Sequence, residues 1–172
     1  MITPDTKDWT WVLERPCPEC GFDASAFARE RVGSMIRSNA AAWLTVLERP
    51  GVAQRPSHTV WSPLEYACHV RDVFRIYDER LRAMLTEDDP QYANWDQDAT
   101  AIDDRYAEQN PRRVAVDLEA GAVLLAHRFD TVAGEQWTRP GSRSDGAHFT
   151  IESFARYLIH DPIHHLHDVE VG

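Results

Sequence analysis

The sequence predicts an all-α protein, a four-helix bundle with a long crossover between the second and third helices. Three observations predict it. Four long segments carry apolar residues at helical spacing, their ends carry helix-capping residues, and convincing alternating strands are absent. With 172 residues, of which 43% are hydrophobic, the chain is long enough for one domain with its own core.

The first helix is expected to begin near Asp23, as N-cap, and to stop before Pro50-Gly51. The chain before it, residues 1–22, contains a Cys-x-x-Cys motif and is expected to form an N-terminal arm. Residues 23–172 are then the bundle domain.

The second helix has the clearest start in the chain, because Ser62 is an N-cap, Pro63 occupies the first helical position and Glu65 closes a capping box. This helix carries His69. The acidic residues from position 87 end it, and residues 87–110 are expected to form the long crossover. Within the crossover, the segment from Trp95 to Asp98 forms either a lid over a site or a solvated loop.

The third helix is expected to start after the cap Asn110 and to end near Gly134. A turn rich in Gly and Ser follows, and Thr150 caps a fourth helix that is apolar around much of its circumference. Two short links and one long connection between four helices are typical of a bundle with a crossover.

Charge and hydropathy indicate which partners to expect. The formal net charge is -10, without a basic patch, so nucleic acid and anionic membranes are not expected as partners. No apolar stretch approaches the roughly 18 residues of a membrane span, and the N-terminus lacks a signal-peptide pattern. An odd number of cysteines fits a reducing compartment. We therefore expect a cytoplasmic protein.

Four of the eight histidines lie between His160 and His167. His160 and His164 are four residues apart on one helix, so both can reach one metal ion, and His69 could complete the set. Asp161 and His165 have the same spacing and lie nearer the centre of the apolar stripe. Since Pro162 makes the helical phase uncertain, the periodicity leaves both pairs open.

Cys17 and Cys20 form half of a zinc knuckle, because a structural site needs four ligands and no second cysteine pair follows. One interpretation is a loop with free or reversibly oxidised thiols. The other is a zinc site that is shared between subunits or completed by His58 or another histidine.

Two segments carry a family resemblance. The segment from Trp61 to Asp72, which includes His69, and the segment from His160 to His164 resemble the paired signature of the DinB-like superfamily of metal-binding bundle proteins. The resemblance covers roughly residues 25 to 170. It implies a four-helix bundle with a crossover, a homodimer, and a divalent metal, Zn, Ni, Fe or Mn, held by His69, His160 and His164.

The resemblance also implies an activity. Relatives include S-transferases and isomerases that use a low-molecular-weight thiol, mycothiol or bacillithiol. A metal with open positions can favour the thiolate and present it to an electrophile, so the expected partners are a small thiol and its electrophile. Asp72 and Tyr157 are candidates for orienting ligands or substrate. The alternatives are a metal-dependent hydrolase and a non-catalytic metal- or small-ligand-binding stress protein.

Overall fold

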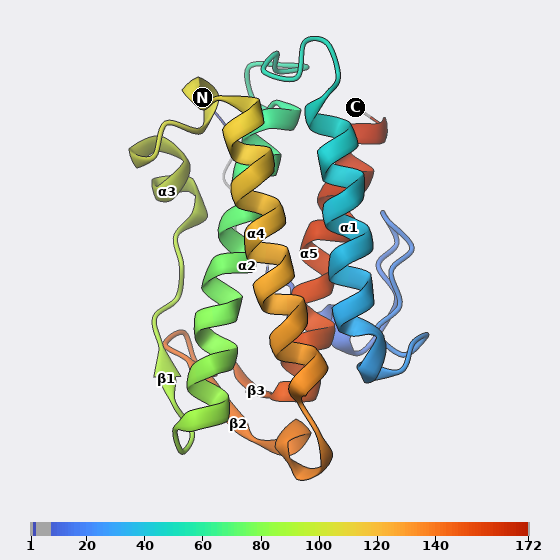
Figure 1. Cartoon of the computed structure of the whole chain (residues 1–172), viewed down its shortest axis with the longest axis vertical. Coiled ribbons are helices and arrows are strands. Elements are labelled where there is room, and N and C mark those ends of the chain that lie inside the picture. The colour runs from blue at the N-terminus through green and yellow to red at the C-terminus, as the bar shows by residue number, and fades with distance from the viewer. Residues whose placement is uncertain (1, 3–7, 172) are drawn as a thin grey trace.

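Four long helices form the body of the molecule in a computed structural model, which describes residue 2 and residues 8–171 (Figure 1). They are α1 (Val32–Leu47), α2 (Pro63–Thr86), α4 (Pro111–Thr131) and α5 (Ile151–Val171). Helix α4 packs mainly against α1 and α2, and α5 packs against the same two helices. The predicted four-helix bundle is confirmed, with α1 and α2 at diagonal corners.

The prediction that the first helix starts near Asp23 was wrong, because α1 begins at Val32 after a short 3-10 helix, Arg29–Arg31. Asp23 Oδ1 does accept a hydrogen bond from Ser25 N, as in a cap, but it closes only a local turn. The carbonyls of Ala24 and Phe27 accept hydrogen bonds from Arg156 of α5. These contacts with α5 hold the segment as a loop.

The predicted starts of the second and third long helices are confirmed. Ser62 Oγ accepts a hydrogen bond from Glu65 N, and the Glu65 carboxylate accepts one from Ser62 N, which completes the capping box of α2. Asn110 Oδ1 accepts hydrogen bonds from two backbone amides at the start of α4. These local interactions fix where α2 begins and therefore the position of His69 along it.

A small three-stranded sheet was not predicted from the sequence. Strand β2 (Pro140–Arg143) pairs antiparallel with β3 (His148–Thr150) and parallel with β1 (Gln91–Tyr92), in the order β1-β2-β3. The strands are two to four residues long, too short for alternation to show in the sequence. The segment predicted as a Gly- and Ser-rich turn is this hairpin.

Residues 87–110 connect α2 to α4 and contain β1, the short helix α3 (Gln97–Asp103) and a 3-10 helix, Tyr106–Glu108. Asp96 caps α3 through a hydrogen bond from Ala99 N. Trp95 Nε1 donates to Thr100 Oγ1 at 2.7 Å, which ties the Trp95 ring to this cap. The connection therefore holds a tryptophan in a defined position beside α2.

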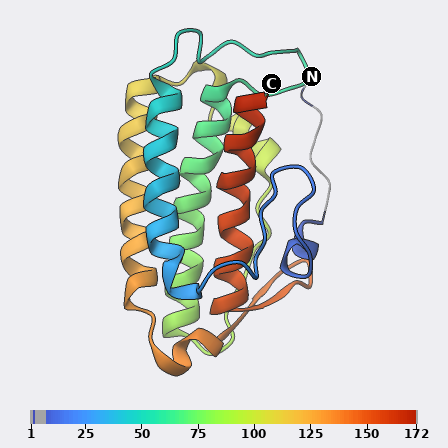
Figure 2. The same ribbon diagram turned by 90° about the vertical axis from the view of Figure 1, so that its right-hand side faces the viewer.

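The N-terminal arm lies along α5, as Figure 2 shows. It includes a 3-10 helix, Thr10–Leu13, and it contributes Val12, Cys17 and Phe22 to the buried apolar residues. The largest side chains that are fully buried come from all four long helices and the crossover: Trp43, Tyr106, Phe74, Phe154, Ile36, Leu64, Leu81, Met84, Leu118, Leu125, Ile151 and Leu158. The arm and the bundle thus share one core.

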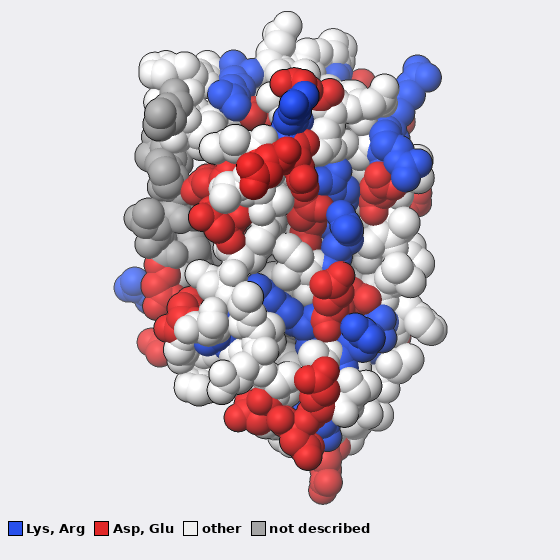
Figure 3. Space-filling view, turned by 90° about the vertical axis from the view of Figure 1, so that its left-hand side faces the viewer, with Lys and Arg blue, Asp and Glu red and all other residues white. Residues whose placement is uncertain are grey.

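Acidic and basic side chains are interspersed on the face seen in Figure 3, with several groups of acidic residues. Among the described residues, no helix has both the length and the apolar character to cross a lipid bilayer.

Candidate functional site

Helix α5 directs two neighbouring pairs of side chains to two different partners. It is continuous through Pro162, whose carbonyl accepts hydrogen bonds from Asn39 Nδ2 and Trp43 Nε1 of α1 at 2.9 and 3.4 Å. Successive residues of a helix differ by about 100° in direction. His160 and His164 consequently face the N-terminal arm, whereas Asp161 and His165 face α2.

The first cluster consists of His69, Asp161 and His165, whose ligand atoms all lie within 4.8 Å of one another. His69 Nε2 is 3.2 Å from Asp161 Oδ1, and His165 Nε2 is 3.9 Å from the same oxygen. His165 Nδ1 lies 2.9 Å from Asp168 Oδ2. The Asp168 carboxylate places the imidazole proton on Nδ1, so the lone pair of Nε2 points into the cluster.

Aromatic rings enclose His69, which is fully buried on α2. The Trp95 ring stacks on it at 5.1 Å between centroids with an interplanar angle of 6°, and the Trp61 ring lies at 5.5 Å. The crossover therefore covers this cluster through Trp95. Tyr66 packs on the His165 ring at 4.9 Å.

The clustering of histidines sets the charge of the acidic groups beside them. Burial opposes the ionisation of Asp161, but the neighbouring His69 and His165 hold the pKa of its carboxyl well below the usual range. Burial also opposes the ionisation of Asp168, but the hydrogen bond with His165 and the nearby charges of His164, His165 and His167 together lower its pKa. Both carboxylates are thus ionised at neutral pH and can attract a cation.

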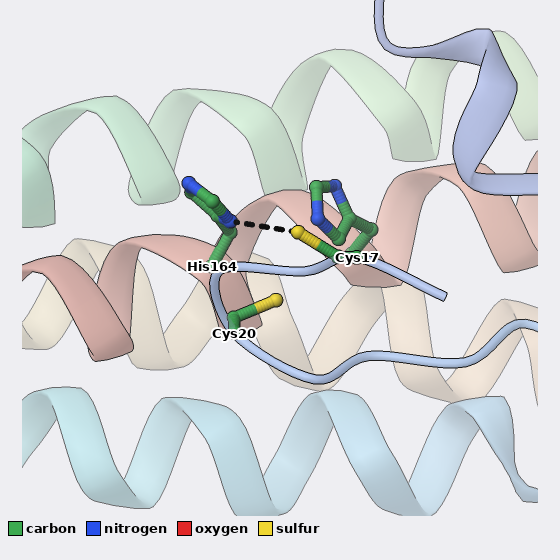
Figure 4. A group of neighbouring side chains, drawn as sticks. Cys17, Cys20 and His164 are labelled. Atoms are coloured by element: carbon green, nitrogen blue, oxygen red, sulfur yellow. Dashed lines mark hydrogen bonds between the residues drawn. The ribbon is translucent and has the colours of Figure 1, made fainter. Parts of the chain in front are cut away.

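The second cluster consists of Cys17, Cys20, His160 and His164, again with all ligand atoms within 4.8 Å of one another. Figure 4 shows the two cysteines of the arm beside His164 of α5. Burial, with a further contribution from His164, lowers the pKa of His160 to about 4, and burial raises the pKa of Cys20 to about 11.

Both clusters border one cavity with a volume of about 1470 Å³. Its walls come from the arm, α2, the crossover, the hairpin and α5. Among the residues that line it are Trp9, Trp61, Trp95, Arg143 and Tyr157. The cavity is therefore a mixed aromatic and charged space, and His160, Asp161, His164 and His165 lie along the α5 wall.

The three histidines predicted from the sequence fall into both clusters. His160 and His164 lie together, as their spacing predicts, but His69 lies with the alternative pair, Asp161 and His165. Periodicity had left both pairs open. The placement follows from packing, because α2 contacts the face of α5 that carries Asp161 and His165. Metal binding by any of these residues stays a prediction.

Other predicted residues have different surroundings. Asp72 is buried beside Arg71 and accepts a hydrogen bond from Tyr106 Oη, so it orients no residue of either cluster. Tyr157 lines the cavity and accepts a hydrogen bond from Arg143. His58 is not part of the cysteine cluster among the described residues. The Cys-x-x-Cys motif and the His-x-x-x-His spacing together signal this cluster, although the sequence left open which histidine other than His58 would complete it.

The sequence profile of the DinB superfamily matches residues 34–169, which is most of the chain. This chain belongs to the DinB superfamily. No curated protein matches the sequence of this DinB-superfamily chain. Its fold is similar to that of YfiT from Bacillus subtilis, described as a probable metal-dependent hydrolase with an unusual four-helix bundle topology. The two share 16% identity and a TM-score of 0.75 over 86% of this chain and 89% of that one.

The donors of the first cluster fit a divalent ion. Two imidazoles and a carboxylate from two helices of this DinB-superfamily bundle converge, with one histidine oriented by a further carboxylate, as is common around protein-bound metals. Three protein ligands leave positions for an exogenous ligand, which is typical of catalytic sites.

Proposed function

We propose that this protein is a metal-dependent enzyme that transfers a low-molecular-weight thiol to an electrophile, with its metal held by His69, Asp161 and His165. The observation that carries the proposal is the convergence of these three donors, two of which, Asp161 and His165, line a large cavity. This set replaces the earlier expectation of His69, His160 and His164.

A divalent ion bound there would lower the pKa of a thiol or water molecule that it coordinates and so supply the nucleophile. Residues of the chain orient the ligands and exclude water. Asp168 orients His165, while the rings of Trp61 and Trp95 keep bulk water from His69. The mixed nitrogen and oxygen donors accept Zn, Ni, Fe or Mn, so cellular availability contributes to the choice of metal.

The volume of the cavity favours two reactants. Sites for one small molecule usually have volumes of about 300–1,000 Å³, and this cavity has about 1470 Å³. Arg80 and Arg143 line it, and their guanidinium groups suit a carboxylate or other anionic group on a thiol such as mycothiol or bacillithiol.

Metal-dependent hydrolysis is the second candidate. Two histidines and a carboxylate also form the zinc sites of several hydrolases, in which the ion activates water. The description of YfiT supports this alternative. A binding protein without catalysis is the third candidate, and it differs from both in that the metal-loaded protein turns over no substrate.

The test compares two reactions of the full chain loaded with one metal at a time. The first is conjugation of mycothiol or bacillithiol to a chlorodinitrobenzene, and the second is hydrolysis of a nitrophenyl ester. We expect thiol conjugation, reduced at least 100-fold in His165→Ala and Asp161→Asn. His127→Ala is the matched control, because His127 is exposed on α4 outside both clusters. Ester hydrolysis without thiol conjugation would favour the second candidate, and no turnover of either substrate would contradict catalysis.

Metal stoichiometry separates this site from the set predicted by sequence. His69→Ala and Asp161→Asn should each lose the metal of the first cluster, whereas His160→Ala should retain it. If His160→Ala and His69→Ala each lose the same bound metal ion and Asp161→Asn keeps it, the assignment to Asp161 and His165 is wrong.

A further inference from the structure

We propose that Cys17, Cys20, His160 and His164 form a tetrahedral zinc site that fastens the N-terminal arm to α5. This site is separate from the one at His69 and has a structural role. Its two cysteines are 140 or more positions away in sequence from its two histidines, so the site can exist only in the folded chain.

The type and spacing of the ligands are those of structural zinc sites. Two cysteines separated by two residues and two histidines separated by three match the usual spacing of a two-cysteine, two-histidine centre. Sulfur and imidazole donors together favour zinc over magnesium or calcium. Two thiolates balance the charge of the ion, and binding releases the two thiol protons to solvent.

The distances agree with a tetrahedron. Zinc bonds of about 2.3 Å to sulfur and about 2.0–2.1 Å to nitrogen place neighbouring ligands roughly 3.3–3.8 Å apart. Cys17 Sγ and His164 Nδ1 are 3.7 Å apart, within that range, and no ligand atom of the cluster is farther than 4.8 Å from another. Small side-chain adjustments are therefore enough for all four to reach one ion.

Burial gives a second, independent reason for a ligand. Cys17, His160 and His164 are buried, with 1%, 3% and 6% of their surfaces exposed. His160 Nε2 is inaccessible to solvent and has no hydrogen-bond partner among the described residues, an arrangement that costs free energy unless something binds it. His164 Nε2 lies 3.4 Å from the carboxylate of Glu19, which leaves Nδ1 directed at Cys17.

The backbone of the arm already has the turn that a pair of cysteine ligands needs. Cys17 N donates to Phe22 O at 2.8 Å, and Gly21 N donates to Cys17 O at 2.9 Å. Gly21 has a φ of +72°, which favours glycine at this position. Figure 4 shows both cysteines of this turn on the side that faces His164.

Four protein ligands would leave no open position on the zinc, so its effect is on the position of the arm. The Trp9 ring packs on His160 and His164 at 5.2 and 5.0 Å between centroids, and it lines the cavity. Fastening the arm to α5 thus fixes one wall of the cavity beside the first cluster.

Cobalt provides the test, because Co²⁺ bound by thiolates has a sulfur-to-metal charge-transfer band in the near ultraviolet and Co²⁺ at His69, Asp161 and His165 does not. We expect the reduced full chain, titrated with Co²⁺, to show this band. Cys20→Ser should lose the band and one equivalent of bound zinc, and His165→Ala should keep the band. Since Cys20 is only partly buried, Cys20→Ser leaves the core intact.

Cys68→Ser is the control for loss of a cysteine, because Cys68 is buried on α2 and its thiol contacts Tyr106 O and Gln109 Oε1. It should keep both the band and the zinc. A protease specific for glutamate gives a second readout. Cleavage after the exposed Glu14 should be faster in Cys20→Ser than in wild type, but unchanged in His165→Ala. Absence of the band from the reduced wild type, or full zinc content in Cys20→Ser, would overturn the proposal. Because His165→Ala alters only the first cluster, its metal content shows whether that cluster binds metal independently of the zinc site.

Discussion

His164 and His165 are adjacent in sequence, yet they belong to different clusters, with ring centroids 6.0 Å apart and planes at 77°. The helix itself causes this separation, because each residue turns the side-chain direction by about 100°. Asp168 contacts both residues, His165 Nδ1 at 2.9 Å and His164 Nε2 at 3.7 Å. A single carboxylate therefore influences two prospective ligands of different ions.

The hydrogen bond from His165 to Asp168 can be tested directly. Asp168→Asn should lower the metal affinity of the first cluster roughly 10–100-fold, because a ligating histidine loses the carboxylate that orients it. Competition with a chelator measures the change. Asp117→Asn is the matched control, since Asp117 is paired with Arg113 on the surface of α4, and its affinity should equal that of wild type. Equal affinities in both variants would show that Asp168 does not orient His165.

Two glycines show how the elements fit together. Both Gly33 of α1 and Gly121 of α4 are buried within helices, but their surroundings differ. A Cβ added at Gly33 would meet Asp130 Oδ1 at 2.1 Å and the carbonyl of Ala126 at 3.0 Å. At Gly121, the nearest atoms would lie 3.5 to 3.8 Å away, at ordinary contact distance. The approach of α1 to α4 thus depends on Gly33.

The two glycines should respond oppositely to the same change. Gly33→Ala should lower the free energy of unfolding by about 1–2 kcal/mol, since the backbone of α4 must move. Gly121→Ala should raise it by about 0.5–1 kcal/mol, because alanine favours a helix more than glycine does. Urea unfolding of both variants measures the difference. Stabilisation by Gly33→Ala would mean that α1 and α4 are not in such close contact.

For the molecule as a whole, ion pairs connect elements that are distant in sequence. Arg29, just before α1, pairs with Glu152 of α5, and Arg128 of α4 pairs with Asp78 of α2. Nearer in sequence, Arg55 of the loop before α2 pairs with Glu65 in the first turn of that helix. Burial opposes the ionisation of Glu65, but Arg55 and Ser62 lower its pKa below the usual range. Folding therefore favours the ionised form of Glu65.

This preference predicts a pH dependence. Because the pKa of Glu65 is lower in the folded state, its stabilisation is complete above the unfolded value of about 4.3 and is lost as the pH falls through the folded value. Glu65→Gln should lower the free energy of unfolding by about 1–3 kcal/mol at pH 7, and the difference from wild type should shrink in acid. Urea unfolding of chelator-treated protein at several pH values measures this. Glu108→Gln, an exposed control, should show no such trend, and a constant difference for Glu65→Gln would contradict the argument.

Local signals in the sequence account for much of the fold. The capping residues Ser62 and Asn110 predicted the starts of α2 and α4 correctly, because a cap acts on amides within three residues. The start at Asp23 was wrong because the carbonyls of that segment bond to Arg156, more than 120 residues later. The short strands of the hairpin likewise depend on pairing with a distant segment.

The residue pattern was sufficient to predict a helical bundle and to show that His160 and His164, like Asp161 and His165, project together from one helix. Packing of the helices and the arm in the folded chain then selects which pair faces His69 and which faces Cys17 and Cys20. Helical periodicity fixes the angle between residues of one helix, whereas the rotation of that helix against its neighbours depends on how all of them pack.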